Sequence, residues 1–300
     1  MTDGTTTTTP ARSVMSPFDK WQLLSKQWMN VQAPAAPSES DAANYVRLVG
    51  DGITGRVLIL GCTPTLRRVL AERARELICA DISPGMMLRS EHVLARAANE
   101  TFVTADWLDL PLDDVSVDAV VGDKVFDNVP PSLWDEWLCG IARVMKPGAC
   151  FATRISPRGR QALKAPPSTP YEVLVRRWAD LVTAKMADLE EACSGFWEDC
   201  LASSTATHSA QVGDQRISRI LPRTKRACLA PFEVDTVERA LVELVLDRYW
   251  SARDATWTAY SLEGVISASA PWFAVSAMLL AHDYSESQRQ PTLGLERRRF

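Results

Sequence analysis

The segment 56–83 combines a glycine turn with an acidic residue placed where an apolar run ends. Gly61 follows one short apolar run, and Asp81 closes a second run twenty residues later. At the carboxyl end of a parallel strand, one carboxylate can accept hydrogen bonds from both hydroxyls of a ribose, because two vicinal donors match two oxygens. A glycine there lets a ligand approach the start of the following helix. This spacing favours a site for a nucleoside.

Polar residues also follow two later apolar runs. Asp106 comes after the third run and could accept the exocyclic amine of an adenine, while Trp107 beside it could cover the face of that base. Asp123 and Asn128 come after the fourth run, in the segment 122–128. Because ligands of an open parallel sheet bind beyond the carboxyl ends of its strands, we expect Asp123 and Asn128 near the reacting atoms.

Other candidates are less tied to strand ends. His208, in a polar segment, is a candidate general base that a lid could bring over the site, and Tyr171 opens a long helical pattern. Lys124 and Asp127, in the same segment as Asp123, could form no more than an ion pair on the surface. The sequence contains no evident Ser-His-Asp set or metal-ligand cluster, so we expect no metal. Four tryptophans either fill the core or wall an apolar chamber suited to a sulfonium cation: Trp21, Trp28, Trp178 and Trp197.

The elements that would position these residues alternate along the chain. Five apolar runs are separated by helical patterns, which predicts βαβ units and a parallel sheet with helices on both faces. The predicted strands are 57–60, 77–80, 101–104, 117–121 and 149–155, and the predicted helices between them are 63–74, 83–97 and 131–145.

The alternation stops after residue 155. We predict one long helix over 171–201, an amphipathic helix over 234–250, and a final hairpin with strands at 256–262 and 272–284. Two helices, 16–30 and 41–50, precede the sheet. The predicted organisation is a disordered tail (1–15), cap helices (16–50), a cofactor-binding core (51–155 and 232–285), a helical lid (156–231) and a flexible tail (286–300).

Three motifs together resemble those of the class I S-adenosylmethionine-dependent methyltransferases. "VLILGCTPTL" lies on the glycine motif, "ICADIS" followed by "PGMM" on the ribose motif, and "TADWLDLPLDDVSVDAVVGDKVFDNV" on the adenine motif and fourth strand. "RVMKPGACFATRI" extends the match, so the resemblance covers about 56–155 and the final hairpin. It implies a Rossmann-like, doubly wound α/β sheet, mostly parallel with an antiparallel strand in the C-terminal hairpin.

The resemblance also implies which residues hold S-adenosyl-L-methionine as co-substrate. They are Gly61, Cys62, Thr63, Asp81, Ile82, Met86, Asp106, Trp107, Gly122 and Asp123. Two features depart from the family pattern. Thr63 and Thr65 replace its second and third glycines, and Ile59 replaces the acidic residue that normally helps to hold the cofactor's amino group.

On this basis we expect an enzyme that methylates a small molecule, in secondary metabolism, with Asp123, Asn128, His208 and Tyr171 as catalytic candidates. One alternative on the same fold is a cyclase that forms an azetidine ring from the cofactor and releases methylthioadenosine, or a transferase of the aminocarboxypropyl group. Another alternative is a non-catalytic, methyltransferase-like binding protein, which the altered glycine turn would suit.

Composition narrows the partners. The formal net charge is −4 with a pI near 5.5, so the chain lacks the basic field that nucleic acid would need. The N-terminus has no apolar secretory region, and no run of apolar residues is long enough for a membrane span. Seven cysteines without a C-x-x-C pair suit free thiols in a reducing compartment. We therefore expect a cytoplasmic monomer or homodimer.

Overall fold

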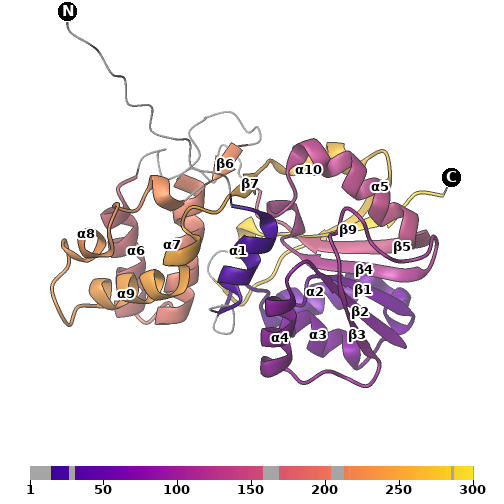
Figure 1. Ribbon diagram of the computed structural model, residues 1–300, viewed down its shortest axis with the longest axis horizontal. Helices are drawn as coiled ribbons and strands as arrows, with labels where there is room; N and C mark the ends of the chain where they lie inside the picture. Colours follow the sequence, from indigo (N-terminus) through magenta and orange to yellow (C-terminus); the bar gives the residue numbers. More distant parts are fainter. Residues whose placement is uncertain are drawn as a thin grey trace, which may run out of the picture.

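The computed structural model describes residues 15–26, 31–157, 169–203, 213–215, 217–284 and 287–299. It divides into a sheet with helices on both faces and a group of helices beside it, with the N-terminal helix α1 (Pro17–Leu24) between them (Figure 1).

Seven strands form the main sheet, in the order β3-β2-β1-β4-β5-β9-β8. The first five strands run parallel, and β9 is antiparallel to both of its neighbours. This confirms the predicted Rossmann-like, doubly wound sheet. The strands are β1 (Arg56–Leu60), β2 (Glu76–Asp81), β3 (Glu100–Thr104), β4 (Val117–Asp123), β5 (Met145–Arg154), β8 (Phe273–Leu279) and β9 (Thr292–Arg297).

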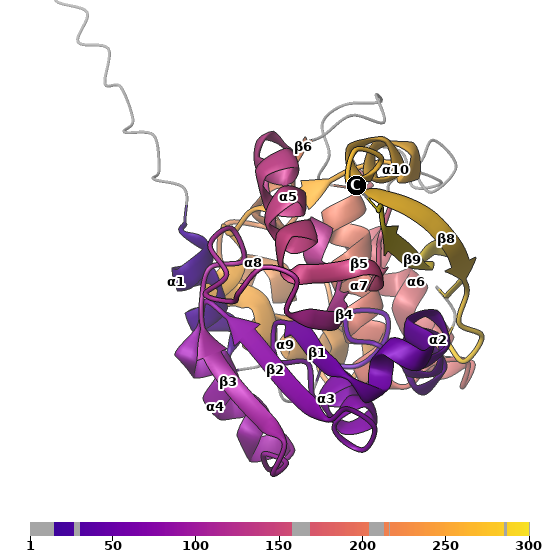
Figure 2. The same ribbon diagram turned by 90° about the vertical axis from the view of Figure 1, so that its right-hand side faces the viewer.

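The inner strands are apolar on both faces because helices cover both faces. Along β1, Leu58 and Leu60 pack with α5 and α10, whereas Val57 and Ile59 pack with α2, α3 and α4 (Figure 2). The sheet-covering helices are α2 (Glu39–Val49), α3 (Pro64–Ala71), α4 (Pro84–Val93), α5 (Trp134–Val144) and α10 (Leu262–Ser269). Side chains that point alternately to the two faces of the sheet thus form two cores, one on each face. The carboxyl ends of the parallel strands lie together at one edge of the sheet.

A third core lies within the helical group. It contains Trp178, Phe196, Leu241 and, from α1, Leu24. The elements are α6 (Tyr171–Thr183), α7 (Leu189–Ser203), α8 (Lys225–Leu229), α9 (Val237–Tyr249) and a small sheet of β6 (Gly213–Gln215) and β7 (Trp257–Ala259). The prediction of one helix over 171–201 is wrong, because the chain turns at Lys185, whose φ is +57°, and continues as a second helix.

The C-terminal hairpin differs from the prediction in its residues. Of the two expected strands, 256–262 contributes β7, which pairs with β6 outside the main sheet, while 272–284 contains β8. The partner of β8 is β9, in the segment predicted as a flexible tail. The side chains of Leu293 and Leu295 are fully buried there, so two leucines in a polar segment suffice to anchor a strand with neighbours on both sides.

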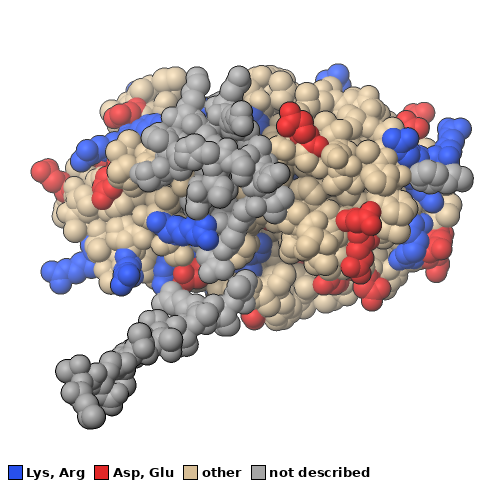
Figure 3. Space-filling model, turned by 90° about the horizontal axis from the view of Figure 1, so that it is seen from above, with Lys and Arg blue, Asp and Glu red and all other residues tan. Residues whose placement is uncertain are grey.

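Two surface features complete the description. In the view from above, acidic and basic side chains are scattered over both ends of this face rather than gathered into one patch (Figure 3). Within the described residues, no helix has the length and apolar character needed to cross a membrane.

Candidate functional site

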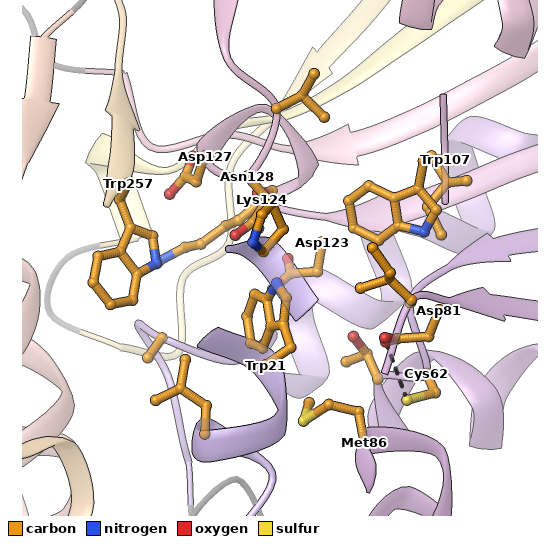
Figure 4. A pocket seen from close by; sticks show the side chains of 18 of the residues that line it. Trp21, Cys62, Asp81, Met86, Trp107, Asp123, Lys124, Asp127, Asn128 and Trp257 are labelled. Carbon is orange, nitrogen blue, oxygen red and sulfur yellow. Dashed lines mark hydrogen bonds between the residues drawn. The ribbon is translucent and has the colours of Figure 1, made fainter. Parts of the chain in front are cut away.

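A cavity of about 210 Å³ opens at the carboxyl ends of the parallel strands, where the strand order reverses between β1 and β4. Its walls come from the loops after β1, β2, β3 and β4 and, across from them, from α1, α7, α9 and β7 (Figure 4). The helical group therefore covers the sheet edge where ligands of this architecture bind.

Gly61, Asp81 and Trp107 enclose one end of the cavity. Gly61 has φ +96°, and a Cβ atom added to it would lie 3.8 Å from both Oδ2 of Asp81 and Cζ2 of Trp107. The indole is fixed in this position because Nε1 of Trp107 donates a 2.8 Å hydrogen bond to the carbonyl of Ala80. A flat apolar ring and a carboxylate therefore face the same space above a glycine turn.

The Asp81 carboxylate is buried and only partly satisfied within the chain. Its Oδ1 accepts a 2.8 Å hydrogen bond from the Ser83 N–H, and its Oδ2 accepts from the Cys62 thiol, a weak donor, at 3.5 Å. Burial raises the pKa of this carboxyl to about 6, and those two hydrogen bonds partly oppose the shift. Additional donors from a ligand would stabilise the ionised form.

At the end of β4, Asp123 is held from behind. Arg154 donates to both of its oxygens, from Nε to Oδ1 at 2.8 Å and from Nη2 to Oδ2 at 2.9 Å. The Tyr45 hydroxyl also donates to Oδ1, at 3.1 Å. Arg154 is fully buried, so this ion pair fixes the carboxylate at the cavity wall.

The N-terminal helix α1 closes the cavity from outside through Gln22. The amide oxygen of Gln22 accepts hydrogen bonds from the Ser83 hydroxyl and from the Gly85 N–H, the latter at 2.9 Å. Both donors belong to the first turn of α4 or its cap, directly after Asp81. The cap helix and the loop that carries Asp81 are therefore joined.

The opposite end of the cavity is aromatic and charged. The rings of Trp197 and Tyr249 stack with centroids 4.0 Å apart, and Trp257 meets Trp197 edge-on at 5.4 Å. Nζ of Lys124 lies 2.7 Å from Oε1 of Glu198, and both side chains are largely buried. This ion pair joins the loop after β4 to helix α7.

Most of the predicted site residues line this cavity together. They are Gly61, Cys62, Thr63, Asp81, Ile82, Met86, Asp106, Trp107, Asp123 and Asn128. Asp106 is exposed, and its Oδ1 caps the Leu108 N–H at 3.0 Å. Gly122 lies beneath the wall instead: an added Cβ would meet Cγ1 of Val125 at 2.5 Å, and its carbonyl accepts from Tyr45.

One predicted catalytic residue lies away from the cavity. Tyr171 lies in the core of the helical group, where its hydroxyl donates to the carbonyl of Cys228 at 2.7 Å, so we assign it no role at the reacting atoms. His208 lies outside the described residues, as does Trp28. Of the tryptophans considered for an apolar chamber, Trp21 and Trp197 line the cavity, whereas Trp178 is in the core.

Several lining or supporting residues were not expected from the sequence. Lys20, Glu198, Tyr249 and Trp257 come from helices and a strand far from the strand-end motifs. Lys124 forms an ion pair with Glu198, and Lys124 and Asp127 are both buried at the cavity, so the expectation that they lie on the surface is wrong. Within the described residues, no group of three or more His, Cys, Asp or Glu side chains is placed to hold a metal ion.

Comparisons with known proteins agree with this geometry. Residues 58–153 match the model of a methyltransferase domain. A 135-residue stretch is 37% identical to demethylmenaquinone methyltransferase of Clavibacter sepedonicus, which corresponds to 44% of this chain and 49% of that protein. The chain thus spans about half the length of this curated relative.

Two solved structures are similar to this chain at low sequence identity, and the first has the higher TM-score. A putative zinc-dependent alcohol dehydrogenase from Rhodobacter sphaeroides has a TM-score of 0.56 at 13% identity, covering 94% of this chain and 98% of that one. The N-methyltransferase NodS from Bradyrhizobium japonicum, solved with S-adenosylhomocysteine, has a TM-score of 0.49 at 10% identity, covering 93% and 98%. The matched segment includes β1 to β5 almost completely, with Asp81, Asp106 and Asp123 at their ends. Residues 58–153 therefore match the methyltransferase domain family, over the strands that carry the candidate site.

Proposed function

We propose that this chain is an S-adenosylmethionine-dependent methyltransferase that acts on a small molecule. The observation that carries the proposal is the buried, incompletely hydrogen-bonded Asp81 carboxylate beside Gly61 and Trp107. A ribose diol would supply the two donors that this carboxylate lacks, and the Trp107 ring would cover the nucleobase. Asp106, which also lines the cavity, would accept from the exocyclic amine of the base.

The cofactor, when bound, supplies an electrophilic methyl group on a sulfonium centre. The residues of the chain then have three tasks: to hold the nucleoside, to align an acceptor and to exclude water. Gly61, Asp81 and Trp107 would hold the nucleoside. Trp21, Trp197 and Trp257 would form the wall against which an acceptor is aligned.

The composition of the lid supports a small acceptor. The cavity is covered by α1 and α7 and lined by several aromatic rings, which suits a compact organic molecule better than a protein tail or a nucleic acid. We propose that this acceptor is a compact organic compound of secondary metabolism. All seven cysteines are free thiols, which supports a reducing cytoplasmic setting.

A second candidate uses the same cofactor without an external acceptor. In a cyclase, the amine of the cofactor would attack its own γ-carbon; the C–N bond forms, the C–S bond breaks, the amine loses a proton and methylthioadenosine leaves. Ile59, in place of an acidic residue, and the covered cavity favour this alternative. Transfer of the aminocarboxypropyl group to another acceptor would release the same product.

One set of measurements separates these possibilities. Calorimetry should detect binding of S-adenosylhomocysteine to the purified protein. Incubation with S-adenosylmethionine and a panel of small hydroxy, amino and carbon nucleophiles should then release S-adenosylhomocysteine. Release of methylthioadenosine without an added acceptor would support the cyclase instead, and binding without turnover under any condition would support a non-catalytic binding protein. Failure to bind any adenosyl ligand would rule out the proposal.

A further inference from the structure

The first strand of this site offers no carboxylate at its carboxyl end. Ile59, two residues before Gly61, is fully buried in the apolar core between the sheet and helices α2 and α3. An isoleucine side chain cannot bind an ammonium group, so the amino group of the cofactor must be held by another residue.

The neighbouring strand β4 does end in a carboxylate. Leu60 pairs with Gly122 in the β1–β4 register, so the next residues, Gly61 and Asp123, lie beside each other at the sheet edge. In the close-up, Asp123 stands between the Asp81 end of the cavity and the Trp257 end (Figure 4).

The order of the strands matches the order of groups along the cofactor. Asp106 follows β3 and Asp81 ends β2, in the order proposed for the base and the ribose, and Gly61 follows β1, the next strand of the sheet. The next strand is β4, so the amino-acid part beyond the sulfur would lie over its end, where Asp123 lines the cavity.

The hydrogen bonds of Asp123 leave capacity for a ligand. A carboxylate has about four acceptor positions, two on each oxygen. Oδ1 uses two, for Arg154 and Tyr45, whereas Oδ2 uses one, for Arg154. One position on Oδ2 is not used by these bonds and suits a charged N–H donor.

The environment fixes Asp123 without cancelling its charge. Nη1 of Arg154 also donates to Oδ2 of Asp41 at 3.1 Å and to Oε1 of Gln290 at 2.9 Å, so other side chains hold the guanidinium as well, and two aspartates share its charge. The adjacent cation, Lys124, is paired with Glu198. An ammonium group of the ligand would therefore complete the charge balance at Asp123.

We propose that Asp123, oriented by Arg154, binds the α-ammonium group of the cofactor and replaces the acidic residue absent from position 59. The inference rests on the proposed function, because it takes S-adenosylmethionine as the ligand. Asp123 is thereby a binding residue, and Arg154 is a positioning residue that acts through it.

The test compares two ligands that differ in the amino-acid part. S-adenosylhomocysteine carries the ammonium group, and 5′-methylthioadenosine has the same nucleoside without it. For Asp123→Asn, we expect the dissociation constant of S-adenosylhomocysteine to rise roughly tenfold or more, with that of methylthioadenosine changed less than about threefold. Arg154→Lys should raise the ratio of the dissociation constant of S-adenosylhomocysteine to that of methylthioadenosine as well, because a lysine cannot hold both carboxylate oxygens of Asp123.

Asp81→Asn is the matched control and should weaken both ligands alike, since both contain the ribose. The ratio within one variant is insensitive to partial loss of folded protein, so a purely structural effect would not change it. An unchanged ratio in Asp123→Asn, with both ligands bound by the wild type, would overturn this inference alone. If the wild type binds neither ligand, the proposed function fails and this inference fails with it.

Discussion

The ammonium group of Lys20 donates a 2.8 Å hydrogen bond to Oδ1 of Asn128, across 108 positions of sequence. It also donates to the carbonyl of Thr256 at 3.3 Å and lies over the rings of Trp21 and Trp257, 5.1 and 4.9 Å from their centroids. One lysine of α1 thus contacts the loop after β4 and the segment that forms β7.

Replacing Lys20 should change how stability depends on pH. Burial lowers the pKa of Lys20 to about 7, against the opposing charge of Asp127, whereas the unfolded chain retains the proton up to about pH 10.5. Between these values the unfolded state binds more protons, so this lysine makes stability rise with pH. The free energy of unfolding of the wild type should rise relative to Lys20→Met by about 1.4 kcal/mol per pH unit above pH 7.

Urea unfolding at pH 7, 8 and 9 measures this difference. Lys26 is exposed in the same N-terminal segment, so Lys26→Met is the control. Its free energy of unfolding should change with pH in parallel with that of the wild type. Parallel curves for Lys20→Met as well would mean that Lys20 remains charged in the folded protein.

Cofactor affinity should fall in acid through Asp81. The pKa of this carboxyl is raised to about 6 in the folded protein, and a ribose diol donates to its ionised form. The dissociation constant of S-adenosylhomocysteine should therefore increase as the pH falls below about 6, approaching tenfold per pH unit. Calorimetry from pH 5 to 8 tests this, and Asp81→Asn should flatten the profile. The same slope in that variant would assign the effect to another group.

The folded state also depends on a buried ion pair between Arg67 in α3 and Glu100 in β3. Two hydrogen bonds join them, from Nε to Oε1 at 2.6 Å and from Nη2 to Oε2 at 2.8 Å, and both side chains are inaccessible to solvent. Arg67→Met should cost about 3–5 kcal/mol in the free energy of unfolding, because it leaves a carboxylate buried without its partner.

The neighbouring residue provides the comparison. Arg68 pairs with Glu39 on the surface, and Arg68→Met should cost less than about 1 kcal/mol. The double variant Arg67→Met with Glu100→Leu should recover part of the loss, since neither charge remains. Equal effects of the two arginine substitutions would show that the buried pair is not responsible.

The contact between α6 and α7 requires a glycine at position 195. A Cβ atom there would meet the Trp178 ring at 2.1–2.6 Å, and that ring is fully buried with its Nε1 bonded to Asp199 at 2.9 Å. Gly195→Ala should therefore destabilise the protein by about 1–3 kcal/mol, although alanine favours helices.

Gly140 in α5 separates the two effects of this substitution. An added Cβ there would meet its nearest neighbour, the Leu108 carbonyl oxygen, only at 4.0 Å, so Gly140→Ala should be neutral or stabilising by up to about 1 kcal/mol. Thermal unfolding of both variants decides the matter, and equal melting temperatures would argue against steric exclusion at residue 195.

The strand-end residues were accessible from sequence because local patterns identify them. Gly61, Asp81 and Asp106 each follow an apolar run, and once the runs are taken as parallel strands their ends must meet at one edge. The order of strands and helices along the chain is therefore enough to place these residues at the same edge, and no contact between distant residues has to be known.

The other half of the site depends on tertiary contacts that no local pattern encodes. Glu198 lies within a helix whose charged residues resemble a solvated face, and only packing against β4 brings it to Lys124. Lys20 likewise looks like an ordinary surface lysine between Phe18 and Trp21. For β9, glycine and charged residues mask a strand that two buried leucines and neighbours on both sides stabilise.

The position of β9 makes it the link between two strands of the sheet. It follows β8 in the chain but lies between β5 and β8, so β8 joins the sheet only through its pairing with β9. Without β9 the edge of β5 would be an open template for backbone pairing, and a foreign strand could occupy it. The six residues of β9, Thr292–Arg297, therefore protect the edge of β5 from pairing with a strand of another chain.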